Sequence, residues 1–186
     1  DDLAALIYTS GTTGEPKGVM CPNSAMLAAT SSIQAYLNLA AGDRVLNVLP
    51  LSHGYGLYHL FLCAGSGAAL ILEKSFAFPA QTLGVIAKER ATVFPAVPAM
   101  LAMLLGMDLS AFDLTSLRIV TSAGAALPAE HLKRLASALP DAEIFAMYGL
   151  TECVRATFLP PGEIDRRPAS IGRGMPGAVL ELIDDT

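Results

Sequence analysis

The chain has 186 residues, 53% of them hydrophobic, and a mean hydropathy of +0.49, which predicts one domain with a sizeable core. The formal net charge of −5, with no basic stripe in the sequence, argues against a nucleic acid or an anionic membrane surface as a partner. The most apolar stretch, residues 94–107, contains Pro95 and Pro98 and is shorter than the roughly 20 residues of a membrane-spanning helix, so no transmembrane segment is expected.

Alternating apolar runs and helical patterns organise the chain. In chain order, the sequence predicts a strand at 3–8, a helix at 24–39 with Asn23 as its N-cap, a strand at 44–49, a helix at 54–64, a strand at 68–72 and a helix at 78–90. It then predicts a strand beginning at 92–94, a helix at 98–105, a strand at 117–122, a helix at 128–139, a strand at 142–147 and a last strand at 179–183. This order predicts an α/β layered fold, with a mainly parallel sheet and flanking helices.

Polar stretches follow several of these strands, at residues 9–17, 52–53, 122–126 and 148–152. Ligands of parallel sheets bind where loops leave the carboxyl ends of the strands. We therefore expect these four stretches to form the functional site.

Cysteine usage indicates the compartment. Cys21, Cys63 and Cys153 are odd in number and widely spaced, a pattern that matches neither a disulfide framework nor a metal motif. The first residues, Asp1 and Asp2, lack the basic region of a signal peptide. A reducing cytoplasm is the expected location.

The first polar stretch combines glycines, hydroxyls and one lysine. Its hydroxyl residues are Thr9, Ser10, Thr12 and Thr13, its glycines are Gly11, Gly14 and Gly18, and its cation is Lys17. A solvent-exposed turn has a similar composition. However, this density of hydroxyls and glycines directly after a strand favours a loop that holds a polyphosphate through backbone N–H groups, hydroxyls and the ammonium.

The loop departs from the nucleoside-triphosphatase P-loop. Counted from Gly11, Lys17 has the required spacing, but Pro16 replaces the second glycine and Gly18 replaces the hydroxyl residue that binds magnesium. A P-loop hydrolase is therefore disfavoured, and a metal at a nucleotide site would need a ligand from elsewhere in the chain.

Residues 8–19, YTSGTTGEPKGV, closely resemble the signature loop of the AMP-forming acyl-CoA synthetases, which belong to the adenylating superfamily with luciferases and peptide-synthetase adenylation domains. Four more segments resemble the family's motifs in the family's order: PLSHGYG at 50–56, SAGAAL at 122–127, YGLTE at 148–152 and SIGRGMPG at 170–177. Ala126 stands where the family commonly has proline. The resemblance implies that residues 1–186 are the central part of the AMP-binding domain, within the large N-terminal domain of an adenylate-forming enzyme.

The resemblance also implies roles for these residues. In the family, a carboxylate attacks the α-phosphate of ATP, pyrophosphate leaves, and a thiol, here coenzyme A, takes the acyl group. Residues 9–17 would hold the β- and γ-phosphates, Thr151 would bond the α-phosphate, and Glu152 would hold Mg²⁺, for which an oxygen ligand is suitable. The implied phosphate-loop residues are Thr9, Ser10, Gly11, Thr12, Thr13, Gly14 and Lys17, and the implied catalytic residues are Lys17, His53, Thr151 and Glu152.

The adenine would lie between two loops. Tyr148, followed by Gly149, would stack on the base, and Gly124, Ala125 and Ala126 would form the opposite wall. His53 would lie between the acyl pocket and the adenylate. Each assignment has a structural alternative: core packing for Tyr148, close packing of small residues for the alanine loop, backbone bonding for His53, and a helix first-turn acid for Glu152.

Other features of the family are absent from these 186 residues. The chain has no Thr-Gly-Asp motif, which carries the family's ribose-binding aspartate. We therefore expect an incomplete enzyme that does not turn over alone and whose uncovered apolar surface favours self-association. Arg155 and Arg173 receive no role.

The acid substrate is partly constrained. Amino-acid-activating relatives place an aspartate near the gate, whereas residues 54–64, GYGLYHLFLCA, contain no acidic residue to pair with an ammonium group. The expected substrate is a fatty, aryl or other amine-free carboxylic acid. Two alternatives stay open: an acyl ligase that delivers to a carrier-protein thiol, and a nucleotide-binding relative without ligase activity.

Overall fold

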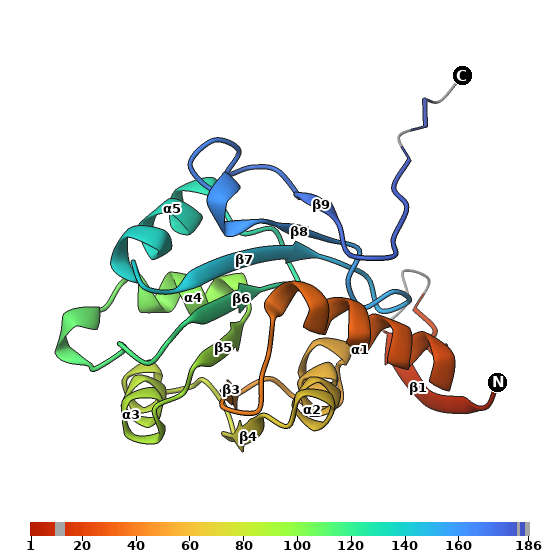
Figure 1. Cartoon of the computed structure of the whole chain (residues 1–186), viewed down its shortest axis with the longest axis horizontal. Coiled ribbons are helices and arrows are strands. Elements are labelled where there is room, and N and C mark those ends of the chain that lie inside the picture. Colours follow the sequence, from red (N-terminus) through yellow and green to blue (C-terminus); the bar gives the residue numbers. More distant parts are fainter. Residues whose placement is uncertain (10–13, 182, 185–186) are drawn as a thin grey trace.

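A seven-stranded sheet forms the centre of the molecule in the computed structural model, which describes residues 1–9, 14–181 and 183–184 (Figure 1). The strand order is β4 (Ala69–Leu72), β3 (Arg44–Asn47), β5 (Val93–Ala96), β6 (Ile119–Ser122), β7 (Glu143–Tyr148), β8 (Thr157–Leu159) and β9 (Arg173–Gly174). The first five strands of this order are parallel, and β8 and β9 pair antiparallel. The predicted α/β fold with a mainly parallel sheet is therefore confirmed.

Helices cover both faces of this sheet. They are α1 (Asn23–Leu37), α2 (Gly54–Ser66), α3 (Pro79–Glu89), α4 (Pro98–Leu104) and α5 (Ala129–Ala138), with two short 3₁₀ segments at Leu109–Ala111 and Pro161–Glu163. Each α-helix begins and ends within two residues of its predicted bounds. Because side chains alternate along a strand, Ile119 packs with α1 and α2 while its neighbour Val120 packs with α3 to α5.

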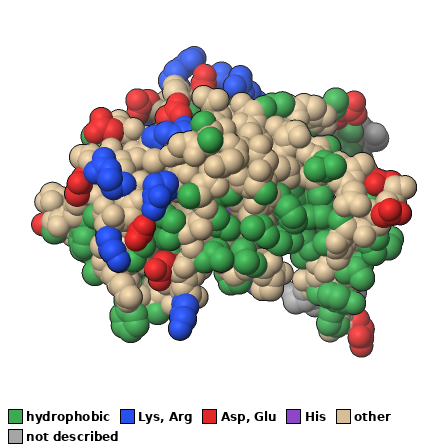
Figure 2. All heavy atoms as spheres, turned by 60° about the horizontal axis from the view of Figure 1, so that its bottom comes forward, with side chains coloured by type: hydrophobic (Ala, Val, Ile, Leu, Met, Phe, Trp, Pro, Cys, Tyr) green, Lys and Arg blue, Asp and Glu red, His purple; other side chains and the backbone are tan. Residues whose placement is uncertain are grey.

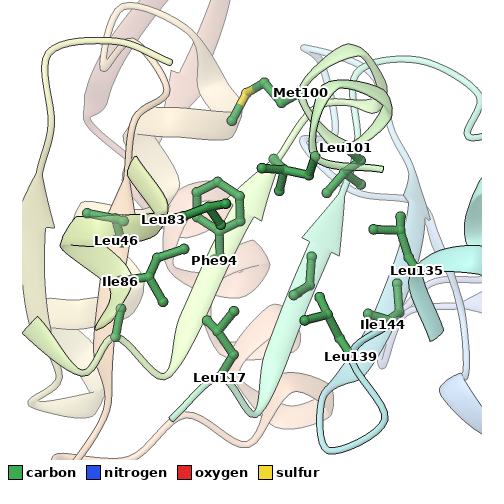
Figure 3. Close-up of a cluster of buried hydrophobic side chains, with 14 of the residues drawn as sticks. Leu46, Leu83, Ile86, Phe94, Met100, Leu101, Leu117, Leu135, Leu139 and Ile144 are labelled. Carbon is green, nitrogen blue, oxygen red and sulfur yellow. The ribbon is translucent and has the colours of Figure 1, made fainter. Parts of the chain in front are cut away.

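The core therefore has two halves. The half on the side of α3, α4 and α5 is drawn in Figure 3, where side chains from the three helices meet those of the sheet; its fully buried members include Leu46, Leu83, Ile86, Leu101, Leu132, Leu135 and Ile144. The other half contains Ile33, Leu37, Val45, Tyr58, Leu62, Phe145 and Phe158. Apolar residues on both faces of the central strands explain the continuous hydrophobic runs in the sequence.

A separate hairpin precedes this sheet. Strands β1 (Leu3–Thr9) and β2 (Lys17–Pro22) pair antiparallel, and α1 follows directly. The sequence did not predict β2. The predicted N-cap at Asn23 is wrong: Pro22 occupies the capping position, and the Asn23 amide donates to the Asp2 carbonyl oxygen (3.0 Å). The Asp1 carboxylate accepts from the Ser24 amide (3.3 Å), so the two residues before β1 supply hydrogen-bond acceptors to the helix start.

The last predicted strand is also wrong. Residues 179–181 and 183 adopt no strand, and Val179 and Ile183 are 86% and 88% exposed. Hydrophobic side chains are also exposed elsewhere, as the green areas of Figure 2 show; they include Leu3, Leu6, Tyr8 and Met20 on the hairpin and Leu60 and Leu72 on α2 and β4. Self-association through such surface stays a prediction. No helix in the described part of the chain is both long enough and apolar enough to cross a bilayer.

Asp43 joins the amino ends of three neighbouring strands. Its carboxylate, 5% exposed, accepts from Arg118 Nε (2.7 Å), from the Thr92 hydroxyl (2.7 Å) and from the Ala40 amide (2.8 Å). Asp43, Thr92 and Arg118 directly precede β3, β5 and β6. Burial alone would raise the pKa of Asp43, but the hydrogen bonds from Arg118, Thr92 and Ala40 outweigh it and lower the pKa to about 2.

Replacing Asp43 with asparagine is expected to destabilise the domain by about 2 kcal/mol at pH 7, because the hydrogen bonds from Arg118, Thr92 and Ala40 lose their charged acceptor. Since the folded-state pKa lies below the unfolded value of about 4, this stabilisation is complete above pH 4 and is lost as the pH falls towards 2. Denaturant unfolding at several pH values measures both effects. Asp141→Asn, at an exposed position, is the matched control, and an Asp43→Asn variant as stable as the wild type would refute the role.

Candidate functional site

The predicted site residues in the described part of the chain lie in loops at the carboxyl edge of the sheet and in the adjoining hairpin. Ser10, Gly11, Thr12 and Thr13 lie outside the described residues. Ile7 of β1 lies beside the start of α2, within 3.9 Å of where a Cβ on Gly54 would be, and it packs in the same core half as Met147 and Val154. The hairpin thus adjoins the end of β7 and the loop that follows it.

Two of the predicted loops line one cavity of about 400 Å³. Its walls are Ser122, Gly124, Ala125, Ala126, Leu127, Ala146, Met147, Tyr148, Gly149, Leu150, Pro168, Ala169, Ser170 and Ile171. We call it the Tyr148 cavity. Tyr148 is 46% exposed at the end of β7, which disfavours the alternative that it is a core aromatic. No site role was predicted for the wall at 168–171, which precedes β9. Its last two residues, Ser170 and Ile171, begin the segment that resembles the family's later glycine-rich turn.

Thr151 and Glu152 line a second cavity of about 260 Å³, which we call the Glu152 cavity. Its other walls are β2, the exposed side of α1, Tyr58, Cys153, Val154 and the turn at 175–178. Thr151 and Glu152 are therefore not among the residues lining the Tyr148 cavity, although the same loop contributes to both.

Glu152 is exposed, and none of the ion pairs between described residues includes it. The described residues contain no group of three His, Cys, Asp or Glu side chains that could hold a metal ion by themselves. One carboxylate at the edge of this cavity fits Mg²⁺, which is commonly bound by one or two carboxylates together with substrate phosphates.

The loop between β7 and β8 is folded back tightly on itself. A Cβ on Gly149 would lie 2.7 Å from the Arg155 Cα, so this close approach requires glycine. Val154 has a φ of +58°, a left-handed conformation that is rare for a β-branched residue, and the Arg155 amide donates to the Cys153 carbonyl oxygen at 2.6 Å. This geometry turns Arg155 into the interior.

Lys17, Thr9 and His53 lie outside the walls of both cavities. Lys17 is exposed at the start of β2 and pairs with Thr9, whose hydroxyl donates to the Lys17 carbonyl oxygen (3.4 Å). Gly14, between Thr9 and Lys17 in the sequence, has a φ of +89°. His53 is exposed at the N-cap of α2, with its amide donating to the Pro50 carbonyl oxygen (3.2 Å). Their catalytic roles stay predictions.

A buried polar cluster lies between α2 and this loop. Arg155 is 2% exposed, and its Cζ lies 4.2 Å from the centre of the Tyr55 ring. The Tyr55 hydroxyl bonds the Thr121 hydroxyl (2.7 Å), and the Tyr55 carbonyl oxygen bonds Nδ1 of His59 (2.7 Å). Burial, together with the charge of Arg155, lowers the pKa of His59 to about 3, so its ring is neutral at pH 7. Sequence reasoning missed this cluster.

Comparison with known proteins places these features in a family. The family model described as "AMP-binding enzyme" matches residues 1–186. The indoleacetate–CoA ligase of Aromatoleum aromaticum is 35% identical over 185 residues, which cover 97% of this chain and 35% of that protein. The chain thus spans about a third of the length of the curated relatives it matches.

Solved structures agree with this family. The crystal structure of VinN, 38% identical, has a TM-score of 0.86 and is matched over 99% of this chain and 46% of its own; VinN has also been solved with 3-methylaspartate and with L-aspartate. The o-succinylbenzoate coenzyme A synthetase MenE of Bacillus subtilis, in complex with ATP and magnesium ion, is 30% identical with a TM-score of 0.86, over 97% of this chain and 37% of its own. The strand order, the loops that meet at the Tyr148 cavity and these matches together show that the chain belongs to the AMP-binding enzyme family of adenylate-forming ligases.

Proposed function

We propose that the complete protein activates a carboxylic acid with ATP and transfers the acyl group to a thiol, that of coenzyme A. The observation that carries this proposal is the meeting of two family-like loops, 124–126 and 148–149, at one cavity of about 400 Å³, while the same chain segment continues to Thr151 and Glu152. The adenine and the phosphates would therefore be held by neighbouring parts of one edge of the sheet. These 186 residues would be the central part of the AMP-binding domain.

In the proposed reaction, a carboxylate oxygen of the acid attacks the α-phosphorus of ATP, and the bond to pyrophosphate breaks. The thiol sulfur then attacks the acyl carbon and AMP leaves. The protein's contribution is alignment of the reactants and compensation of charge. Tyr148 would stack on the adenine, Thr151 would donate to the α-phosphate, and the Glu152 carboxylate would hold Mg²⁺, which supplies charge compensation at the phosphate oxygens.

The acid is proposed to lack an amino group. VinN has been solved with two amino acids, but residues 54–64 of this chain contain no carboxylate that could pair with a substrate ammonium. An unpaired ammonium in a buried pocket would be costly. The thiol acceptor, the cytoplasmic location and the inactivity of residues 1–186 alone stay predictions.

The test is to supply the complete protein with ATP, Mg²⁺ and a panel of carboxylic acids with and without α-amino groups. Acid-dependent release of pyrophosphate, followed by thioester formation with coenzyme A, is the expected result. Release of inorganic phosphate without an acid would instead indicate a hydrolase. ATP binding with neither product would indicate a nucleotide-binding relative, and thioester formation only with a carrier protein would change the acceptor.

A further inference from the structure

Arg155 is a buried cation with few partners. Its Nη1 donates to the Val154 carbonyl oxygen (2.9 Å), but its buried Nε has no hydrogen-bond partner among the described residues. None of the ion pairs between described residues includes it. A buried guanidinium is ordinarily paired with a carboxylate or fully hydrogen-bonded, because removing its charge from water is energetically costly.

The side chains around Arg155 do not neutralise it. Burial raises the pKa of Tyr36 to about 12 despite the nearby guanidinium, and burial also raises the pKa of Tyr55. His59 is neutral, because burial and the charge of Arg155 lower its pKa to about 3. The face of Tyr55 offers a cation–π contact, which compensates only part of the lost hydration. The described cluster therefore keeps a net positive charge at neutral pH.

The position of Arg155 connects this charge with the proposed site. Val154, whose carbonyl oxygen binds the guanidinium, lines the Glu152 cavity, and so does Tyr58, one turn after Tyr55 on α2. On the other side, the Tyr36 hydroxyl contacts the sulfur of Met147 (3.1 Å), and Met147 lines the Tyr148 cavity. Arg155 itself lines neither cavity, but Val154 and Tyr58 line one and Met147 lines the other. The guanidinium therefore lies just behind side chains that face the proposed site.

The backbone next to Arg155 is also in a strained conformation. The left-handed Val154 directly precedes Arg155, and such a conformation is unfavourable for a β-branched residue. If Arg155 only filled space, an apolar side chain would do so without the cost of burying a charge.

We propose that Arg155 selects the acid substrate by pairing with a second carboxylate, so that the enzyme activates dicarboxylic acids in preference to monocarboxylic acids. This inference rests on the proposed function and specifies its substrate class. One carboxylate of the acid would react with ATP, and the other would supply the ion-pair partner that Arg155 lacks. A guanidinium suits this task because its N–H groups match the two oxygens of a carboxylate.

The first experiment compares acids that differ in one charge. The complete wild-type protein is tested in ATP–pyrophosphate exchange with straight-chain dicarboxylic acids of four to eight carbons, their monomethyl esters and the monocarboxylic acids of equal length. The dicarboxylic acids are expected to give kcat/KM values at least about 30-fold higher than the esters, which keep the shape but remove one charge. Equal values for the three classes would overturn the proposal and leave the proposed ligase function intact.

The second experiment changes Arg155. Arg155→Gln is expected to lower kcat/KM for the preferred dicarboxylic acid about 50-fold and to change the value for a monocarboxylic acid less than about threefold. Arg155→Lys keeps the charge and should restore part of the preference. Arg166→Gln, at an exposed position, is the matched control. An equal loss for both acid classes would show a purely structural role and refute the proposal.

Binding measurements separate this inference from the proposed function. Calorimetric titration of the wild-type protein with the same acids, in the absence of turnover, should show tighter binding of the dicarboxylic acid, with the difference abolished in Arg155→Gln. If Arg155→Gln does not fold, comparing dicarboxylic with monocarboxylic acids on the wild type and on Arg155→Lys still tests whether Arg155 binds the second carboxylate. Selective binding without pyrophosphate release would support Arg155 as an anion site and refute the ligase, whereas no preference in binding would refute the anion site.

Discussion

Replacing Glu152 with glutamine is expected to lower adenylation by the complete protein about 10²–10³-fold, measured as acid-dependent ATP–pyrophosphate exchange. Glutamine keeps the shape of the side chain but removes the charge that we propose binds Mg²⁺ in the Glu152 cavity. The variant should also need more Mg²⁺ for half-maximal rate. Its fold should be unaffected, because Glu152 is exposed and none of the ion pairs between described residues includes it.

The control for this experiment is Glu130→Gln. Glu130 is an exposed glutamate in the first turn of α5, and it lines neither the Tyr148 cavity nor the Glu152 cavity. Exchange by this control should match the wild type at every Mg²⁺ concentration. An unchanged Mg²⁺ dependence in Glu152→Gln would show that another residue holds the metal.

Replacing Gly172 with alanine is expected to destabilise the domain by about 3 kcal/mol or more. Gly172 has a φ of +84°, and an added Cβ would overlap the Phe158 carbonyl group and approach the Leu159 nitrogen to 2.5 Å. These neighbours are backbone atoms of β8, so they cannot rotate away. The change should also reshape the wall of the Tyr148 cavity at 168–171, because the Gly172 amide donates to the Ser170 hydroxyl (3.0 Å).

Substitutions at two other glycines separate the two causes of the expected destabilisation, which are steric overlap of the added Cβ and strain of the left-handed backbone. Gly177 shares the φ of +84° but has nothing within 4 Å of an added Cβ, so Gly177→Ala should cost only the conformational strain, about 1 kcal/mol. Gly162 has free space and no left-handed backbone, so Gly162→Ala should be close to neutral. Denaturant unfolding of the three variants tests this order. Equal stability of Gly172→Ala and Gly177→Ala would show that β8 moves to accommodate the added atom.

The sequence predicted the parallel part of the fold because its strands are buried on both faces. Such strands read as continuous apolar runs, and the helices between them have a clear periodicity, as in α3 with Leu83 and Ile86 buried on one side. The antiparallel additions had no such signal. Strands β8 and β9 have three and two residues and are defined by their partners, not by a local pattern.

The opposite error occurred at residues 179–183, which were predicted as a strand. This run has the apolar composition of a strand, but its described residues pair with no neighbouring strand. Local propensity cannot supply a pairing partner, and β-propensity largely reflects packing against neighbours. The N-cap was wrongly predicted at Asn23 for a related reason: the groups that accept hydrogen bonds from the start of α1 come from Asp1 and Asp2, more than 20 residues earlier.

In the candidate site too, features set by a local motif were predictable from the sequence, whereas features set by contacts between distant residues were not. The loops at 124–126 and 148–149 carry compact motifs, and both line one cavity in the structure. Arg155 carries no motif. Its burial depends on the backbone of Val154 and on the ring of Tyr55, which is 100 positions away in the sequence.

The pairing of Tyr148 with Thr157 leaves only residues 149–156 to reverse the chain between β7 and β8. Under our proposals, this short segment contains the phosphate contact, the metal ligand and the anion-recognising residue. The residues that contact the α-phosphate and the metal ion and the residue that recognises the acid would then lie in one short segment that can be exchanged as a unit. Grafting residues 149–156 between relatives should transfer acid preference while the strands on either side stay unchanged, and an insertion within the segment should alter nucleotide use and acid choice together.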